Sequence, residues 1–386
     1  MKVLFRVEFG SRVGWGHASR CLQIAKALKE LDVEILFCSL APSREFPSLD
    51  REIGDGGFTR LQLPPCSQAD HLAVGKLPHI CVPCDGRETL SIVVGQKVDL
   101  VVVDAYGLSS SWTDMMRGEA AICRISDYPV DGDVDYLIDY GFDATTQKHG
   151  GALSPGAKAL LGPAFAPISR DYQRFELPEL SERNEPPRLL LSLGGSGQVS
   201  RLRKVIEDVR VVHPSSPITI AGNRKSLGFS LDGLLSAVAI VQADGLAGLF
   251  AEHDISIVSG GVSMYEQLAA SKPGIVIETA KNQRFALEKA LTSGIVDGVI
   301  WPANGKVRDL LVDEQARTRN AKEEWLKSRS VVDHLGTLRI ALALLNFDLK
   351  DLELREVGPT DLPFLFRVSN QPSSRTSSLN TRLISA

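Results

Sequence analysis

Short apolar runs alternate with amphipathic stretches along most of the 386 residues, and this alternation constrains the fold more than any other feature. The runs are rich in Val and Ile and stay apolar at successive positions, which is typical of strands buried on both faces of a parallel sheet. The stretches between them have the apolar spacing of covering helices, so we expect an α/β fold with right-handed crossovers. The expected strands are Val3–Val7, Val33–Phe37, Leu100–Val103, Ala121–Ile125, Leu189–Leu193, Ile218–Ala221, Ala237–Val241, Ile255–Val258 and Gly274–Ile277.

The alternation is interrupted by a polar, proline-containing segment. Ser181–Arg188 reads SERNEPPR, which cannot pack into a core and is typical of a linker. Glu314–Leu345 reads as helical, with a break expected near Ser328–Ser330. The expected division is an α/β domain at 1–170, a linker at 171–187, a second α/β domain at 188–325, a helix at 326–347 that returns to the first domain, and a tail at 348–386.

Composition and charge exclude several classes of protein. Lys and Arg number 43 against 47 Asp and Glu, so the net charge of -4 argues against a nucleic-acid partner. No apolar run reaches roughly 18 residues, so no membrane span is expected. The N-terminus carries Arg6 and Glu8 within its apolar stretch and reads as a strand rather than a signal peptide. We therefore expect a cytoplasmic protein.

The cysteines predict neither a disulfide framework nor a metal centre. Six cysteines in a chain of this length, with no export signal, are typical of reduced thiols. Cys81 and Cys84 form a CxxC with Cys66 upstream, but no second pair has zinc-finger spacing. No metal and no cofactor are expected.

A glycine-flanked histidine follows the first expected strand and opens a helix. The glycines of Gly14-Trp15-Gly16-His17 allow a sharp turn and close approach of a ligand. Ser19 stands where a dinucleotide fingerprint requires glycine. The helix dipole disfavours imidazolium by about 0.3–1 kcal/mol, so we expect His17 to be neutral and to act as a general base. The alternative is a histidine that only caps the helix. Gly14, Gly16 and Arg20 are expected to contact the substrate.

Two further glycine pairs follow expected strands of the second domain. In open α/β sheets such positions bind ligands, and their backbone amides can hold a diphosphate without a metal. Glu266, one turn into the following helix, could accept both hydroxyls of a ribose. The alternatives are tight turns and a solvated glutamate. The expected nucleotide-binding residues are Gly194, Gly195, Ser196, Gly260, Gly261, Ser263 and Glu266.

Polar residues follow two more strands. Asn282 and Gln283 lie in a Lys-Asn-Gln-Arg cluster that can orient a sugar or a phosphate, or can simply begin a helix. Asp104 and Tyr106 follow the strand Leu100–Val103. Asp104 either touches the substrate or fixes its loop. All four are candidate substrate-binding residues.

Together these segments resemble a known family, the UDP-2,4-diacetamido-2,4,6-trideoxy-β-L-altropyranose hydrolases of pseudaminic acid biosynthesis. The resemblance covers about residues 1–345, and the order of the motifs is specific. The second half also resembles the wider two-domain glycosyltransferase group that includes the lipid II-forming N-acetylglucosaminyltransferase. The motifs are GWGHASRC, VVVDAYGLSSSW, LLGPAF, LLLSLGGSG, DISIVSGGVSMYEQ and KNQR.

The resemblance implies two facing Rossmann-like domains with a cleft between them. It implies hydrolysis of a UDP-sugar at the anomeric carbon, with inversion and release of UDP. His17 matches the family's catalytic histidine, and Asn282 matches a polar residue near the sugar and phosphates. Gly194, Gly195, Gly260, Gly261 and Glu266 match its nucleotide site.

The chain departs from the family pattern near the sugar. Glu8 stands in the segment that commonly has Asp, and Gly197 replaces the Asp after GlyGlySer. Ala164 and Phe165 replace a basic residue and Tyr. Precursors of pseudaminic and legionaminic type therefore both stay open. The tail LELREVGPTDLPFLFRVSNQPSS resembles the opening of a GCN-related N-acetyltransferase without its acetyl-CoA loop, and RTSSLNTRLISA is expected to be disordered.

Two alternative functions remain. One is a glycosyltransferase, in which an acceptor hydroxyl replaces water. The other is a non-catalytic module that binds a nucleotide-sugar. The expected partner is a UDP-sugar in every case, and the sequence does not predict an oligomeric state.

Overall fold

The computed structural model describes residues 1–8, 16–40, 47–64, 80–150, 153–175, 186–194, 199–222, 238–241, 245–302, 306–317 and 327–347. Some of the residues discussed above lie outside this part: Gly14, Cys66, Gly195, Ser196, Gly197, residues 176–185 of the expected linker, and the tail from 348. No described helix is long and apolar enough to cross a membrane.

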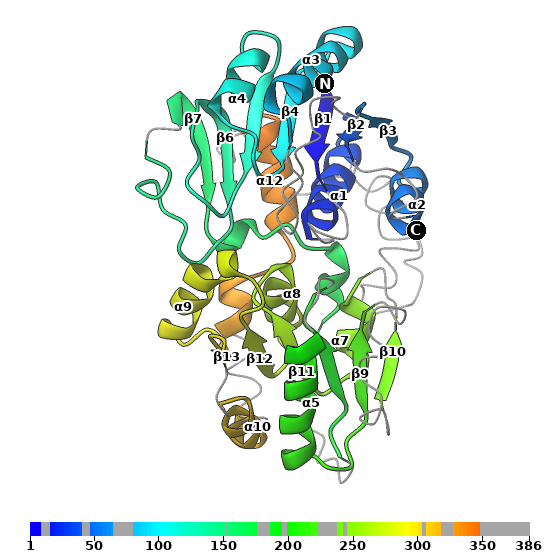
Figure 1. The fold of residues 1–386 in the computed structure, drawn as a ribbon, viewed down its shortest axis with the longest axis vertical. Coiled ribbons are helices and arrows are strands. Elements are labelled where there is room, and N and C mark those ends of the chain that lie inside the picture. Colours follow the sequence, from blue (N-terminus) through cyan, green and yellow to red (C-terminus); the bar gives the residue numbers. More distant parts are fainter. Residues whose placement is uncertain are drawn as a thin grey trace, which may run out of the picture.

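Two parallel sheets, one after the other in the chain, form the framework (Figure 1). The first has the strand order β3-β2-β1-β4-β5-β6-β7 and the second β10-β9-β8-β11-β12-β13. The strands of the first sheet are β1 (Lys2–Val7), β2 (Glu34–Ser39), β3 (Thr59–Gln62), β4 (Leu100–Asp104), β5 (Ala121–Ile125), β6 (Val134–Asp139) and β7 (Leu153–Leu161). Those of the second are β8 (Leu189–Ser192), β9 (Ile218–Ala221), β10 (Val238–Val241), β11 (Ile255–Ser259), β12 (Gly274–Ile277) and β13 (Asp297–Val299).

Helices cover both faces of each sheet. The described helices are α1 (Gly16–Lys29), α2 (Pro47–Asp55), α3 (Val82–Gln96), α4 (Ser110–Met116), α5 (Val199–Val212), α7 (Ala247–Glu252), α8 (Val262–Ala270), α9 (Arg284–Thr292), α10 (Lys306–Arg317) and α12 (Gly336–Leu344), with the 3-10 helices η2 (Pro163–Phe165), η3 (Arg170–Arg174) and η5 (Lys281–Gln283).

Alternate residues of one strand enter different cores. Val3 and Phe5 of β1 pack with α1 and α12, whereas Leu4 packs with α3 and α4. In the second sheet, Ile257 of β11 packs with α5 and α10, and Val258 packs with α7, α8 and α9. This two-sided burial explains the uninterrupted apolar runs in the sequence, and the α/β fold class is confirmed.

All nine expected strands are present, and β3, β6, β7 and β13 were not expected. The missed strands carry polar or glycine residues, as in VDYLID of β6 and LSPGAKALL of β7, so their apolar pattern is weak. The expected helix break near Ser328–Ser330 is wrong: residues 327–331 are helical and the break lies at 332–335. Asp333 explains this position, because its carboxylate accepts the N–H of Leu335 and pairs with Arg339.

α12 lies beside α1 although the two helices are far apart in sequence (Figure 1). Ile340, Ala341 and Leu344 of α12 are buried in the core around α1, and Asn346 accepts a hydrogen bond from Tyr136 at 2.8 Å. The two halves also meet through aromatic rings: Tyr265 of α8 packs on Tyr140 with centroids 5.0 Å apart.

Each sheet has one point at which successive strands run outward in opposite directions. In the first sheet it lies between β1 and β4, and in the second between β8 and β11. Loops leaving the carboxyl ends of such strands part and form a crevice in which α/β proteins bind ligands. His17 and Asp104 follow the first strand pair, and the glycine pairs follow the second.

Candidate active site

His17 and Asp104 form a buried pair at the first of these crevices. His17 Nδ1 lies 2.6 Å from Asp104 Oδ1, and the two residues are 8% and 1% exposed. Because the carboxylate can only accept, Nδ1 carries the proton and Nε2 is left as the basic nitrogen of the ring. Asp104 therefore contacts the candidate base, a role that differs from both the substrate contact and the loop fixing expected from the sequence.

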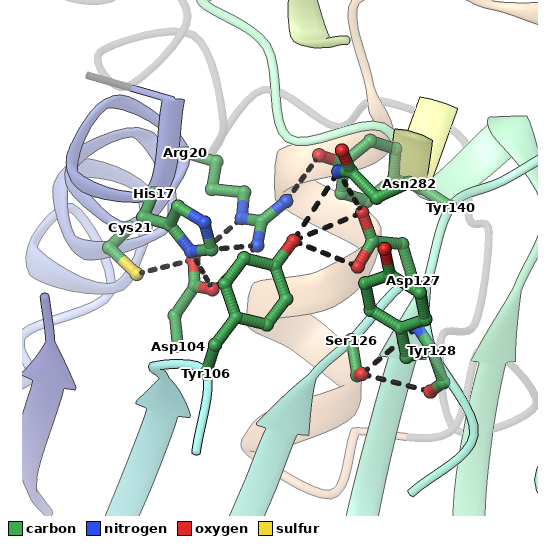
Figure 2. Close-up of polar contacts among 10 residues, drawn as sticks. All are labelled: His17, Arg20, Cys21, Asp104, Tyr106, Ser126, Asp127, Tyr128, Tyr140 and Asn282. Atoms are coloured by element: carbon green, nitrogen blue, oxygen red, sulfur yellow. Dashed lines mark hydrogen bonds and ion pairs between the residues drawn. The ribbon is translucent and has the colours of Figure 1, made fainter. Parts of the chain in front are cut away.

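Arg20 lies one turn along α1 from His17 and binds the same carboxylate. Its Nε and Nη2 donate to Asp104 at 2.6 and 2.5 Å, and its Nη1 donates to Tyr140 at 2.7 Å (Figure 2). Cys21 Sγ lies 3.5 Å from the same carboxylate. Arg20 is 6% exposed. These three bonds and this burial favour a positioning role for Arg20 over the expected contact with substrate.

Asp104 keeps its negative charge in this buried setting. Burial alone would raise the pKa of its carboxyl, but Arg20 and then His17 outweigh that effect and hold the pKa well below its usual range. Burial raises the pKa of Tyr140 to about 12, so its hydroxyl stays protonated beside Arg20. His17, the candidate base, is therefore hydrogen-bonded to a carboxylate that stays ionised.

Tyr106, Asp127 and Asn282 form a second cluster that joins the two halves of the chain (Figure 2). The Tyr106 hydroxyl donates to Asp127 at 3.0 Å, and Asn282 Nδ2 donates to Asp127 Oδ2 at 2.7 Å. The Tyr106 ring meets the His17 ring edge to face, with centroids 4.8 Å apart. Burial and the charge of Asp127 raise the pKa of Tyr106. Asn282 follows β12 of the second sheet. A residue of the second half thus contacts Asp127 and Tyr106, and Tyr106 in turn packs on His17.

Three described glycines lie at the second crevice. Gly194 follows β8 with φ +86°, a region that favours glycine. Gly260 and Gly261 follow β11 and precede α8, whose first amides are available to an anion. Gly16, at the start of α1, has open space where a Cβ would lie.

Gln283 supports the glycine pair. Its Oε1 accepts from the N–H of Thr279 at 2.8 Å and of Ala280 at 3.2 Å, and a Cβ on Gly261 would lie 3.3 Å from its Nε2. The side chain holds the turn after β12 against the turn after β11. Its amide oxygen is used within this loop, which favours a positioning role over the expected direct contact.

Glu266 lies in α8 and is partly buried. Burial raises the pKa of Glu266 to about 7, although the neighbouring hydroxyls of Tyr172 and Ser263 oppose this shift. A carboxyl so placed gains from a ligand that donates hydrogen bonds to its charged form. This is the chemistry that vicinal ribose hydroxyls supply.

The departures from the family pattern have structural partners. Glu8 forms an ion pair with buried Arg6 at 2.6 Å and accepts the N–H of Leu40 at 2.9 Å. Ala164 accepts a hydrogen bond from Arg339 at 3.0 Å, and Phe165 packs into the core around α12. The residues at these three positions therefore take part in ion pairs, hydrogen bonds or packing within the first half of the chain and α12.

Sequence reasoning missed Asp127 and Tyr140. Tyr140 directly follows β6 and Asp127 is the second residue after β5, and a polar residue near a strand's carboxyl end was the only signal that could have found them. Among the described residues, no group of three His, Cys, Asp or Glu side chains is arranged to hold a metal ion.

No protein-family model matches the chain. It is 21% identical over 299 residues to an uncharacterized protein of Methanocaldococcus jannaschii, an alignment that covers 74% of this chain and 57% of the relative. The chain thus spans just over half the length of this curated relative.

Solved structures resemble this chain over nearly its whole described length. MurG of Acinetobacter baumannii aligns with TM-score 0.56 and 13% identity, covering 89% of this chain and 99% of that chain. A glycosyltransferase of Rickettsia africae gives TM-score 0.60 and 12% identity, covering 91% and 99%. The UDP-GlcNAc 2-epimerase of Neisseria meningitidis, bound to UDP-GlcNAc, gives TM-score 0.58 and 12% identity, covering 90% and 100%. At these identities the likeness establishes the fold, which is the two-domain, Rossmann-like glycosyltransferase B fold.

Proposed function

We propose that this chain hydrolyses a UDP-linked diacetamido-trideoxy sugar at its anomeric carbon and releases UDP and the free sugar. The observation that carries the proposal is the His17–Asp104 pair at the crevice of the first sheet. A histidine whose Nδ1 proton is held by a carboxylate presents Nε2 as a general base. The order of motifs in the sequence supports a sugar nucleotide as the substrate.

In the proposed reaction, His17 Nε2 takes a proton from water as the oxygen attacks the anomeric carbon. The bond between that carbon and the diphosphate oxygen breaks, its electron pair leaves with UDP, and the configuration inverts. Asp104 stabilises the imidazolium that forms. General-base assistance of this kind contributes about 10²–10⁴-fold.

The second half would hold the nucleotide. The glycine turns after β8 and β11 and the start of α8 offer amides to the diphosphate, which is the leaving group. Glu266 would accept the ribose hydroxyls. Asn282 would lie between the two halves, near the sugar and the phosphates.

A glycosyltransferase is the second candidate, because the same base could deprotonate an acceptor hydroxyl. The solved structures that share the fold include proteins named as glycosyltransferases, and this is the observation that favours it. The two functions differ in whether UDP release requires an acceptor.

The test is to incubate the protein with a panel of UDP-linked diacetamido sugars and follow UDP by chromatography. Release without an acceptor supports hydrolysis, whereas release only with an acceptor supports the transferase. His17→Asn should abolish release and leave UDP affinity within about twofold. His213→Asn is the matched control, since His213 is a buried histidine next to the turn that precedes β9. Wild-type turnover by His17→Asn would refute the assignment of the base.

A further inference from the structure

A pocket of about 260 Å³ adjoins the candidate active site within the first half of the chain. One wall is the turn from Asp104 to Ser109, which follows β4. The other wall runs from Arg124 to Asp131 and includes the turn after β5. Tyr106 belongs to both sites, because it lines this pocket and its ring also meets His17. A substituent bound in this pocket would therefore belong to a ligand that also lies next to His17, the proposed base.

Arg124 is one of the residues that line this pocket. The residue is 9% exposed, and one of its terminal nitrogens, Nη2, donates to the backbone carbonyl of Leu108. The other, Nη1, is buried and has no hydrogen-bond partner among the described residues. A buried donor without an acceptor destabilises the protein, and more so when it is charged. An acceptor on a ligand would remove that destabilisation.

The charges around Arg124 favour a neutral acceptor over an anion. Asp131 and Asp104 line the same pocket, and both act on Arg124 as opposite charges. Asp104 is also paired with Arg20 and His17, but Asp131 faces the pocket with its own negative charge. A carboxylate or phosphate here would meet that charge as well as the guanidinium. A carbonyl oxygen gains the hydrogen bond without this repulsion.

The rest of the lining is mixed. Ala105, Leu108, Ile125 and Pro129 offer carbon surface, and Ser109 and Ser126 offer hydroxyls. A methyl group next to the bound carbonyl would bury its surface against the first four side chains. A small acyl group has both features: one strong acceptor and one methyl.

We propose that this pocket is the subsite for a neutral acylamino substituent of the sugar, with Arg124 donating to the acyl carbonyl and the apolar wall receiving the methyl. This inference rests on the proposed function, since it names the substituent that the same site reads. A site with a buried donor also rejects an analogue that lacks the acceptor, because the donor is then left unpaired. The pocket would thus select for the acylamino group as well as bind it.

The experiment measures binding by calorimetry for matched pairs of ligands: UDP-N-acetylglucosamine with UDP-glucose, and UDP-N-acetylgalactosamine with UDP-galactose. UDP alone is the control for the nucleotide side. The wild type should bind the N-acetylated member at least about tenfold more tightly in one pair or both. Arg124→Met should bring that ratio close to one and leave UDP affinity unchanged.

Ser109→Phe is a second variant that fills the pocket and keeps Arg124. The Ser109 hydroxyl bonds only to Ser111 among the described residues and does not cap α4, so its loss should not disturb the fold. It should abolish the same discrimination even if Arg124→Met does not fold. The proposal is overturned if the wild type prefers neither N-acetylated ligand, or if the preference survives in Ser109→Phe.

The outcomes separate this inference from the proposed function. If the N-acetyl preference holds and depends on Arg124 and Ser109, but no sugar nucleotide is cleaved, then hydrolysis is refuted and the subsite stands. If UDP does not bind, then the nucleotide site is refuted. The pocket is then tested with N-acetylglucosamine and N-acetylgalactosamine against glucose and galactose by ligand-observed NMR, and equal signals would overturn it.

Discussion

Arg20 and His17 hold one carboxylate from the same face of α1. Arg20 Nη2 and His17 Nδ1 both lie within hydrogen-bond distance of Asp104 Oδ1, at 2.5 and 2.6 Å, and are 3.1 Å from each other. Residues three apart on a helix are neighbours, so the spacing of the two side chains follows from the sequence. The helix that carries the proposed base thus also carries the cation that keeps its carboxylate partner charged.

Asp104→Asn should lower the rate of UDP release about 10²–10⁴-fold and leave UDP affinity within about twofold. An amide can donate as well as accept, so it no longer fixes the proton on Nδ1, and Nε2 loses its defined basic role. The measurement is the rate of UDP release together with calorimetry. Asp99→Asn, at the opposite end of β4, is the matched control, and equal rates in the two variants would contradict the dyad.

Arg20→Met should destabilise the fold by about 3–5 kcal/mol, because it leaves the buried Asp104 carboxylate without its main partner. The double variant Arg20→Met/Asp104→Asn should recover part of this loss, since the uncompensated charge is then gone. Chemical denaturation of the wild type, both single variants and the double variant closes the cycle. Additive effects within about 0.5 kcal/mol would show that the pair is not coupled.

UDP affinity should rise as the pH increases through about 7. Burial raises the pKa of Glu266 to about 7, so below that value the carboxyl is neutral and accepts ribose hydroxyls less well. Calorimetry from pH 5.5 to about 8.5 measures this dependence. The UDP affinity of Glu266→Gln should not show the part of the pH dependence that comes from Glu266. The titration of UDP itself contributes equally to both proteins and cancels when they are compared. Parallel curves for the two proteins would contradict the role of Glu266.

The same group has an opposite effect on folding. Because the pKa of Glu266 is about 7 in the folded protein and its ordinary value is 4.5, the folded state binds the proton more tightly than the unfolded chain. Its contribution is fully present below pH 4.5 and is lost as the pH rises through about 7. Glu266→Gln should therefore raise Tm by a few degrees at about pH 8, by the usual relation of free energy to Tm. An unchanged Tm at that pH would show that the carboxyl is well solvated.

The sequence allowed the strand-end residues to be found, but not their pairing. His17, Asp104 and the glycine pairs were predicted because glycine and polar residues after an apolar run have a local signal. The contact between His17 and Asp104 depends on β1 lying next to β4. Neither segment by itself indicates which strands are neighbours. Asp127 was missed for the same reason, since its partner Asn282 lies in η5, which follows β12 of the other sheet.

Arg124 shows a different limit. It occurs in a short expected strand, AICRI, where a single basic residue among apolar ones gives no local signal of a ligand site. Its burial follows from the turn after β4, whose Leu108 carbonyl accepts from the guanidinium. Only the packed fold brings that turn over the strand, so no local pattern could have identified the pocket.

Asp127→Asn should weaken the contact between the two halves of the chain. The carboxylate accepts from Asn282 at 2.7 Å and from Tyr106 at 3.0 Å, and hydrogen bonds to charged groups contribute about 1.5–3 kcal/mol. An amide at this position can still accept from one donor through its oxygen, but its NH₂ group then faces the other. We expect faster amide hydrogen exchange in η5 and at residues 105–107, measured by mass spectrometry. Tyr128→Phe is the matched control, because Tyr128 lies next to Asp127 but its exposed ring only packs edge to face on Tyr106. Unchanged exchange in Asp127→Asn would show that the packing of Tyr140 and Phe142 on Tyr265 holds this part of the interface without Asp127.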